Sequence, residues 1–211
     1  MLWRIYPKFK YFYRDYKNKE FNLLDVGCGN NSARQTKKFF KECNYYGIDK
    51  DTHNNTDETL SLMEKFYELD LSCNKLEDIP DNFFNVIIVN HVIEHLSNGV
   101  NVISDLTTKL QTDGVIYIEF PSVKSLKFPS MKGTLNFCDD PTHVKLYDVK
   151  EICNILLEHN YKIIKAGNRR DPVRILLSPL ILISLVLRKR PITSILWDLM
   201  GFADFVYAKK M

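Results

Sequence analysis

The segment LLDVGCGNNS, residues 23–32, has the residue types of a ligand-binding turn. An apolar run reaches an acid at Asp25, and Gly27 and Gly29 then form a tight turn before a segment with helical character. A side chain at either glycine would block the approach of a ligand to the backbone. A dinucleotide-binding turn would carry a third glycine at the helix start, but polar residues follow at 30–32. The Asp25 carboxylate would repel a pyrophosphate and suits a ligand with positive charge, such as the sulfonium and α-amino group of S-adenosylmethionine.

Two further acids stand at the ends of predicted strands. Residues 44–49, NYYGID, predict a second strand that ends in Asp49, at about the interval at which a Rossmann-type acid binds ribose hydroxyls. Residues 66–72, FYELDLS, predict a third strand with Asp70 placed to accept a hydrogen bond from an adenine amino group. A single acid at a strand end is as readily a helix cap or turn former. Three acids in these positions favour a nucleoside-binding site.

The remaining elements predict an α/β fold. A fourth strand passing into a helix is expected within residues 83–96, and a fifth strand at 114–122. Amphipathic spacing predicts a helix at 97–111 and another at 148–159, with Asp148 as its N-cap. A sixth strand is expected at 161–167.

From about residue 23 to 167, the chain resembles class I S-adenosylmethionine-dependent methyltransferases. The resemblance rests on four motifs in the same order and at the same intervals: LLDVGCG, YYGIDKD, ELDLS and VNHVIEHL. Residues 202–210 resemble the last strand of that family. The resemblance implies a Rossmann-like, seven-stranded, mostly parallel sheet with helices on both faces and an antiparallel last strand between the fifth and sixth. It implies S-adenosyl-L-methionine as cofactor. The candidate cofactor-binding residues are Asp25, Gly27, Cys28, Gly29, Asp49, Lys50, Asp70, Leu71, Asn90 and His91.

His143 is the first candidate for a catalytic base. The loop at 121–147 follows the fifth strand, at the sheet edge where open α/β sheets bind ligands. By resemblance, a histidine here recurs in subgroups that act on sugars and lipid-linked intermediates. Its unperturbed pKa is near neutral, so it could take the proton of an attacking hydroxyl. The alternative is a structural histidine bound to its own loop. Asp139 and Asp140 lie close by, but without a further ligand they do not predict a metal site.

His91 is the second catalytic candidate. It shares the segment after the fourth strand with Glu94 and His95, and a helix there would place both histidines on one face. HVIEH is not the HExxH zinc motif. The alternative is that these side chains shape the pocket, as we also expect for Glu119.

Composition agrees with a single cytoplasmic α/β domain. Its 211 residues suffice for one α/β domain with an appendage, and a net charge of +3 does not indicate a nucleic-acid partner. Five cysteines without paired spacing predict a reducing compartment and exclude a disulfide framework. The N-terminus lacks the continuous apolar stretch of a secretory signal.

Three parts of the chain are expected. Residues 1–20 are an aromatic and basic leader, from Trp3 and Arg4 onward, which either packs against the fold or stacks RNA bases. The methyltransferase domain would comprise residues 21–170 and 202–211. Residues 171–201 form an apolar helical insertion that is too short to span a membrane but has basic flanks. Peripheral membrane contact through 175–190 is one interpretation; a lipid-binding lid, a dimer contact and a buried hairpin are the others.

We expect O-methylation of a small molecule, a surface-glycan precursor or a lipid-linked intermediate. The competing interpretations are an RNA methyltransferase, an NAD-binding oxidoreductase and a non-catalytic cofactor-binding module. The sequence leaves the oligomeric state open.

Overall fold

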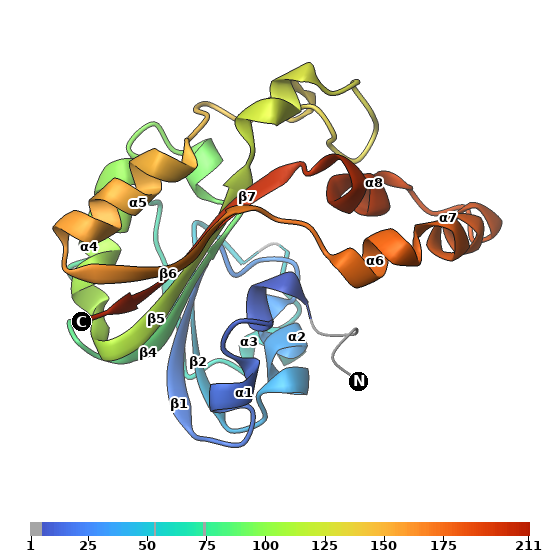
Figure 1. Cartoon of the computed structure of the whole chain (residues 1–211). Coiled ribbons are helices and arrows are strands. Elements are labelled where there is room, and N and C mark those ends of the chain that lie inside the picture. Colours follow the sequence, from blue (N-terminus) through green and yellow to red (C-terminus); the bar gives the residue numbers. More distant parts are fainter. Residues whose placement is uncertain (1–5, 53, 74) are drawn as a thin grey trace.

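The computed structural model describes residues 6–52, 54–73 and 75–211. In this described part, seven strands form one sheet in the order β3-β2-β1-β4-β5-β7-β6 (Figure 1). The central pairs β1·β2, β1·β4, β2·β3 and β4·β5 are parallel, and β7 lies antiparallel between β5 and β6. The expected fold is therefore confirmed. The strands are β1 Phe21–Val26, β2 Cys43–Asp49, β3 Lys65–Glu68, β4 Phe84–Asn90, β5 Leu110–Pro121, β6 Tyr161–Asn168 and β7 Ala203–Lys210.

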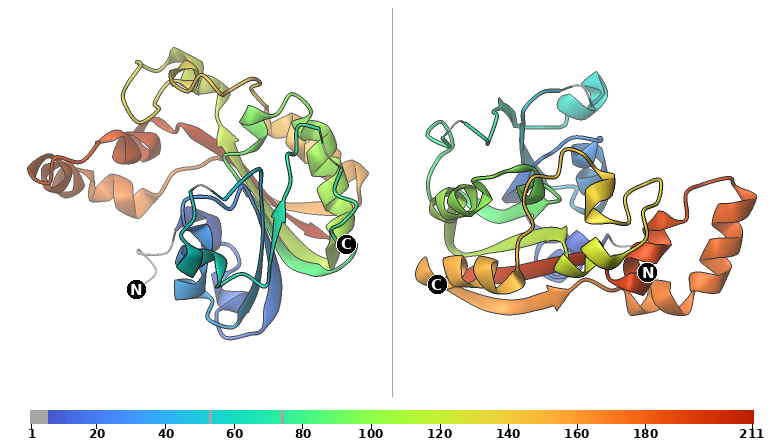
Figure 2. Two further views of the ribbon diagram at one scale, coloured as in Figure 1. Left: turned by 180° about the vertical axis from the view of Figure 1, so that it is seen from behind. Right: turned by 90° about the horizontal axis from the view of Figure 1, so that it is seen from above.

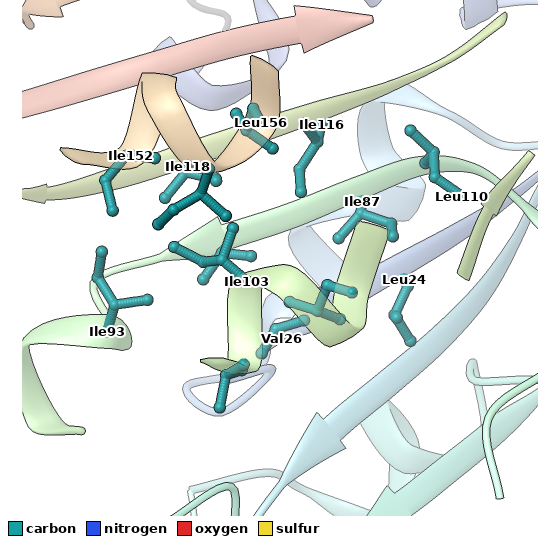
Figure 3. Packing of buried hydrophobic residues seen from close by; sticks show 14 of the residues in the cluster. Leu24, Val26, Ile87, Ile93, Ile103, Leu110, Ile116, Ile118, Ile152 and Leu156 are labelled. Carbon is teal, nitrogen blue, oxygen red and sulfur yellow. The ribbon is translucent and has the colours of Figure 1, made fainter. Parts of the chain in front are cut away.

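Helices cover both faces of this sheet. On one face, α4 (Gly99–Lys109) and α5 (Val149–Glu158) bury aliphatic side chains against the strands (Figures 1 and 3). As predicted, Asp148 caps α5, since its carboxylate accepts a hydrogen bond of 2.7 Å from Lys150 N. The other face carries α1 (Tyr13–Tyr16), α2 (Ser32–Phe39) and α3 (Asp57–Leu60).

The aromatic leader packs into the second face. Its 3₁₀ helix η2 (Pro7–Phe9) and α1 place Phe9 and Phe12 in the core, with no exposed surface. Tyr11 stacks on Tyr207 with ring centroids 5.2 Å apart. Burial of these rings favours the packing interpretation over base stacking. Trp3 and Arg4, which belong to the predicted leader, lie outside the described residues.

The segment after β4 differs from the expected helix. His91 takes a left-handed backbone conformation, with φ at 55°, and a short 3₁₀ helix, η3 (Ile93–His95), follows it. The left-handed residue redirects the chain, so His91 and His95 do not share a helix face and have different neighbours. The prediction that they share one is wrong. Similarly, β3 ends at Glu68, which leaves Asp70 in the loop beyond the strand.

Residues 171–201 fold as α6 (Pro172–Leu176), α7 (Ser178–Leu187) and α8 (Thr193–Met200). Asp171 caps α6 by accepting from Val173 N and Arg174 N. These helices extend beyond the end of the sheet, and α7 lies farthest from it (Figures 1 and 2). Among the described residues, no helix is both long and apolar enough to cross a membrane. The loop after β5 contains the 3₁₀ helices η4 (Val123–Lys127) and η5 (Phe137–Asp139).

Candidate functional site

Two adjacent cavities open at the carboxyl ends of β1, β2 and β4, in the part of the chain that the structure describes. The first cavity has a volume of about 500 Å³ and the second about 490 Å³. They share four wall residues, which are Gly27, Gly29, Asn30 and His91. This is the sheet edge at which open α/β folds bind their ligands.

The first cavity combines carboxylates with an apolar wall. Asp49 Oδ2 accepts from Gly29 N at 2.9 Å, and Oδ1 accepts from Lys50 N at 2.8 Å. Hydrogen bonds from the Ser72 hydroxyl and N–H keep the pKa of Asp70 below its usual value, so Asp70 is a carboxylate. The apolar residues lining this cavity are Ile48, Leu69, Leu71, Val92 and Leu96. A nucleoside, with a flat ring and donor hydroxyl and amino groups, fits this set of side chains.

Gly27 makes the wall between the cavities thin. Its φ of +74° is a conformation that other residues rarely adopt, and a Cβ built there would lie 2.4 Å from Val92 Cγ2. A Cβ at Gly29 would lie 3.1 Å from Asp49 Oδ2. Glycine is therefore required at position 27, and at position 29 a side chain would press on Asp49.

The second cavity is built by segments from both ends of the chain. The leader contributes Lys8, β5 contributes Glu119 and the residue after β6 contributes Arg169. Helices α6 and α8 contribute Arg174 and Trp197. An ion pair between Lys10 and Asp171 joins the leader to the start of α6. The leader and the helices at 171–201 thus complete a cavity that the sheet alone would leave open.

His91 lies between two carboxylates at the junction of the cavities. Its Nδ1 is 2.9 Å from Glu94 Oε1, and its Nε2 is 3.2 Å from Glu119 Oε1. Burial by itself lowers the pKa of His91, but the hydrogen bonds and charges of Glu119 and Glu94 outweigh it and raise the pKa to about 9. His91 is consequently an imidazolium at neutral pH, which donates from both ring nitrogens and has no lone pair for a proton.

An ion network continues from His91 into the insertion. Arg169 Nε lies 2.9 Å from Glu119 Oε1, and Arg169 Nη1 lies 2.9 Å from Asp198 Oδ1. Arg174 Nε donates to Asp198 Oδ2 at 2.6 Å. Burial raises the pKa of Glu119, but Arg169 and His91 outweigh it and hold that pKa below its usual value. Sequence reasoning missed Arg169 and Asp198 as site residues, although an acid in the apolar run TSILWDLM was a signal.

Two predicted cofactor residues support the turn from behind. Asp25 is 1% exposed, and its Oδ2 accepts from Ser32 Oγ at 2.5 Å and from Tyr45 OH at 2.7 Å. Cys28 is fully buried, with Sγ where a Cβ at Gly47 would stand. Neither residue is among those lining the two cavities. Their side chains pack against β2 and α2, so these residues support the glycine turn, and their direct contact with the cofactor stays a prediction. The other candidates line a cavity: Gly27, Gly29, Asp49, Lys50, Asp70, Leu71, Asn90 and His91.

His143 lies behind the first cavity. Its side chain is 5% exposed, and its ring packs between Phe137 and His95, with centroids 4.7 and 4.8 Å away. Nδ1 is 2.7 Å from the Phe137 carbonyl oxygen, which can only accept, so Nδ1 carries a proton and Nε2 is the only ring atom that could act as a base. Thr142 and His95, which touch each other, line the cavity in front of it.

The loop brings His143 close to Asp140, one of the acids near it in sequence, and also to Glu94 of η3. The possible ligand atoms of Glu94, His95 and His143 lie within 4.8 Å of one another, and Glu94 Oε2 has no hydrogen-bond partner among the described residues. Asp139 instead accepts from the backbone of its own loop at Leu135 and Asn136. Asp140 Oδ2 forms an ion pair of 3.9 Å with His143 Nε2 when the imidazole is protonated.

Comparisons with known proteins agree with this architecture. A family model described as a methyltransferase domain matches residues 4–166. No curated protein matches the sequence. Among solved structures, an S-adenosylmethionine-dependent methyltransferase from Archaeoglobus fulgidus is similar, with 20% identity, 94% of this chain and 90% of that chain covered, and a TM-score of 0.61.

Two further structures share the fold. One is an S-adenosylmethionine-dependent methyltransferase from Mesorhizobium loti, with 12% identity, all of both chains covered and a TM-score of 0.62. The other is phosphoethanolamine N-methyltransferase 2 from Haemonchus contortus in complex with S-adenosyl-L-methionine, with 15% identity and a TM-score of 0.62. That match covers 91% of this chain and 49% of the other.

Proposed function

This chain belongs to the methyltransferase-domain family and is a class I S-adenosylmethionine-dependent methyltransferase, and from this premise we propose that it methylates a hydroxyl oxygen of an acceptor bound in the second cavity. The acceptor would be a small molecule, a surface-glycan precursor or a lipid-linked intermediate. The cofactor is S-adenosyl-L-methionine, which supplies a methyl group already activated by its sulfonium. The protein's task is therefore alignment of donor and acceptor.

The first cavity has the groups to hold that cofactor. Asp49 stands where a carboxylate can accept from both ribose hydroxyls, and the charge-assisted bonds would fix the ribose. Asp70 can accept from the adenine amino group, with Leu71 and Leu96 along the ring faces. Gly27 leaves space for the remainder of the molecule at the boundary with the second cavity.

The shared wall is the observation that carries the proposal. Because Gly27, Gly29 and His91 line both cavities, a donor in the first and an acceptor in the second would meet at that wall. The second cavity offers the aromatic ring of Trp197 beside the charged groups of Arg174 and Glu119. An aromatic face next to several hydrogen-bonding groups suits a polar, hydroxyl-bearing acceptor such as a sugar.

Proton handling follows from the state of each histidine. The His91 imidazolium donates its two N–H groups to Glu94 and Glu119, so it cannot take a proton from the acceptor, and it contributes positive charge at the wall between the cavities. His143, whose Nδ1 donates to the Phe137 carbonyl, remains our candidate base through Nε2. It lies behind Thr142 and His95, which line the first cavity, so it could act directly only on an acceptor that extends from the second cavity past the shared wall to Thr142. A base is needed only if the acceptor loses its proton during attack.

The alternatives have weaker support. Burial of Phe9 and Phe12 withdraws two of the aromatic rings on which the RNA interpretation rested. An NAD-dependent enzyme would need to place a pyrophosphate at a turn that lacks the third glycine. A non-catalytic module would bind the cofactor and never consume it.

Titration calorimetry with S-adenosylmethionine and NAD in parallel tests the cofactor. Incubation with S-adenosylmethionine and fractionated cell extract, followed by measurement of S-adenosylhomocysteine, tests turnover. Product in a lipid or glycan fraction supports the proposal. Product only with RNA, or cofactor binding without product in any fraction, contradicts it.

A further inference from the structure

An exposed apolar face runs along α6 and α7. Leu176, Leu180, Ile183 and Leu187 are 80, 67, 59 and 78% exposed. Their alternating spacing of four and three residues puts them on one side of a helical segment. Val173, Leu177 and Val186 extend the exposed surface on either side. An apolar surface of this extent on a water-soluble domain marks an interaction site.

The exposed charges around this face are all positive. Arg170, Arg188, Lys189 and Arg190 are exposed, and in the described part of the chain the last three have side chains without an ion-pair partner. Both acids of residues 171–201 are buried: Asp171 is 3% exposed and pairs with Lys10, and Asp198 is 1% exposed and pairs with arginines. A partner of this face therefore meets hydrocarbon side chains bordered by uncompensated cations.

The size and position of α7 suit a helix that lies in a membrane surface. Its 10 residues are about 15 Å long, too short to span a bilayer. In both views α7 lies at the far edge of the molecule, away from the sheet (Figure 2). A shallow apolar cavity of about 240 Å³, lined by Leu177, Leu180, Ile181, Ser184 and Leu185, opens between its side chains.

We propose that the apolar face of α6 and α7 docks on a membrane surface that contains anionic lipids. The aliphatic side chains enter the boundary between headgroups and acyl chains, and Arg188, Lys189 and Arg190 contact lipid phosphates. A second copy of this chain would present the same cations, whereas an anionic bilayer supplies the opposite charge. Lipid is thus the occupant that both the apolar and the charged groups match.

Docking would hold the second cavity near the bilayer. Arg174 on α6 and Trp197 on α8 line that cavity, and both helices flank α7 in the chain. An acceptor attached to a lipid could then reach the cavity without leaving the membrane. This consequence rests on the proposed function, whereas docking itself does not.

Sedimentation with lipid vesicles tests the docking, without cofactor or acceptor. We expect the protein to pellet with phosphatidylcholine vesicles that contain phosphatidylglycerol, to remain in solution with pure phosphatidylcholine, and to be released by high salt. Changing Arg188, Lys189 and Arg190 together to glutamine should lower the partition coefficient roughly 100-fold, since each charge adds about 1 kcal/mol near an anionic surface. Changing Leu180 and Ile183 to serine should also abolish pelleting.

Matched variants elsewhere separate this face from general surface properties. Changing the exposed Lys19, Lys38 and Lys41 to glutamine removes the same charge, and changing Leu157 and Ile164 to serine removes similarly exposed aliphatic groups. We expect both controls to pellet like the wild type. All variants should bind S-adenosylmethionine with unchanged affinity by calorimetry, since none of the changed residues lines either cavity.

Two outcomes would overturn the proposal. One is a wild-type protein that stays in the supernatant with anionic vesicles at low salt. The other is a protein that sediments as a dimer in analytical ultracentrifugation, with the serine variant monomeric, and that binds no vesicles. Either could occur while cofactor binding and methyl transfer persist, so failure here is distinguishable from failure of the proposed function.

Discussion

Gly29 N donates a hydrogen bond of 2.9 Å to Asp49 Oδ2, which joins the turn after β1 to the last residue of β2. One carboxylate therefore shapes the glycine turn and faces the first cavity. Loss of Asp49 should disturb both the turn and any ligand that it contacts.

Asp49→Ala should weaken S-adenosylmethionine binding by about 1.5–3 kcal/mol, or roughly 10- to 150-fold in Kd, because charge-assisted bonds to the ribose are lost. Asp49→Asn keeps a hydrogen-bond acceptor without the charge, so its affinity for S-adenosylmethionine should lie between those of the wild type and Asp49→Ala. Calorimetry on both variants measures this, with the exposed Asp105→Ala on α4 as a control. Undiminished binding by Asp49→Ala would refute the assignment to the ribose.

Gly27→Val should abolish cofactor binding. The new side chain would meet Val92 Cγ2 and force a left-handed conformation on a β-branched residue. The same calorimetric titration tests the loss, and circular dichroism checks that the variant is folded. A folded variant that binds with wild-type affinity would contradict the tight turn described for this glycine.

His91 should make stability depend on pH in a defined window. The pKa of His91 is about 9 in the folded protein and about 6.5 in the unfolded chain. The contribution of His91 to the free energy of unfolding is therefore complete below pH 6.5 and is lost as pH rises through 9. The shift corresponds to about 3 kcal/mol as an order of magnitude. In urea titrations at pH 6.5, 8 and 9.5, the unfolding free energy of the wild type should fall with rising pH, and that of His91→Gln should lack this fall.

His159→Gln, a change at the end of α5 remote from both cavities, is the matched control for that series. It should lose unfolding free energy with rising pH in parallel with the wild type. If the unfolding free energies of the wild type and His91→Gln change in parallel with pH, His91 is not held as a cation between Glu94 and Glu119.

If His143 is the base, His143→Ala should keep cofactor affinity and lose roughly 10²–10⁴-fold in kcat. His143→Asn distinguishes this role from a structural one, since an amide can replace Nδ1 as donor to the Phe137 carbonyl but cannot take a proton. Comparable losses in both variants support the base. Activity restored by asparagine would assign His143 to the support of its loop.

Local patterns were enough to predict the strands and the α5 cap, because apolar runs and an acid before a helix depend on neighbours in sequence. The backbone at His91 could not be predicted, because VNHVIEHL is also compatible with a helix and only tertiary packing selects the left-handed residue. Asp25 shows a second limit. Its partner Tyr45 comes from the adjacent strand, and nothing within LLDVGCG indicates that the carboxylate is already occupied.

The ion network around Arg169 could not be predicted either, because its residues are far apart in the sequence. Atoms of Arg169 and Asp198 lie 2.9 Å apart in the fold, but Arg169 follows β6 and Asp198 is in α8, with α6 and α7 between them in the chain. Sequence spacing identified the apolar run between them and gave no indication that its ends meet at a cavity.

The position of β7 between β5 and β6 determines when this enzyme can be completed during translation. Every other strand of the sheet has been synthesised before Ala203, yet β6 has hydrogen-bond partners only in β7 among the described strands. Until β7 emerges from the ribosome, the edges of β5 and β6 are open to pairing with other chains. A nascent chain arrested before β7 emerges would therefore be a substrate for chaperones and an aggregation risk, even though all its glycine-turn residues are already present.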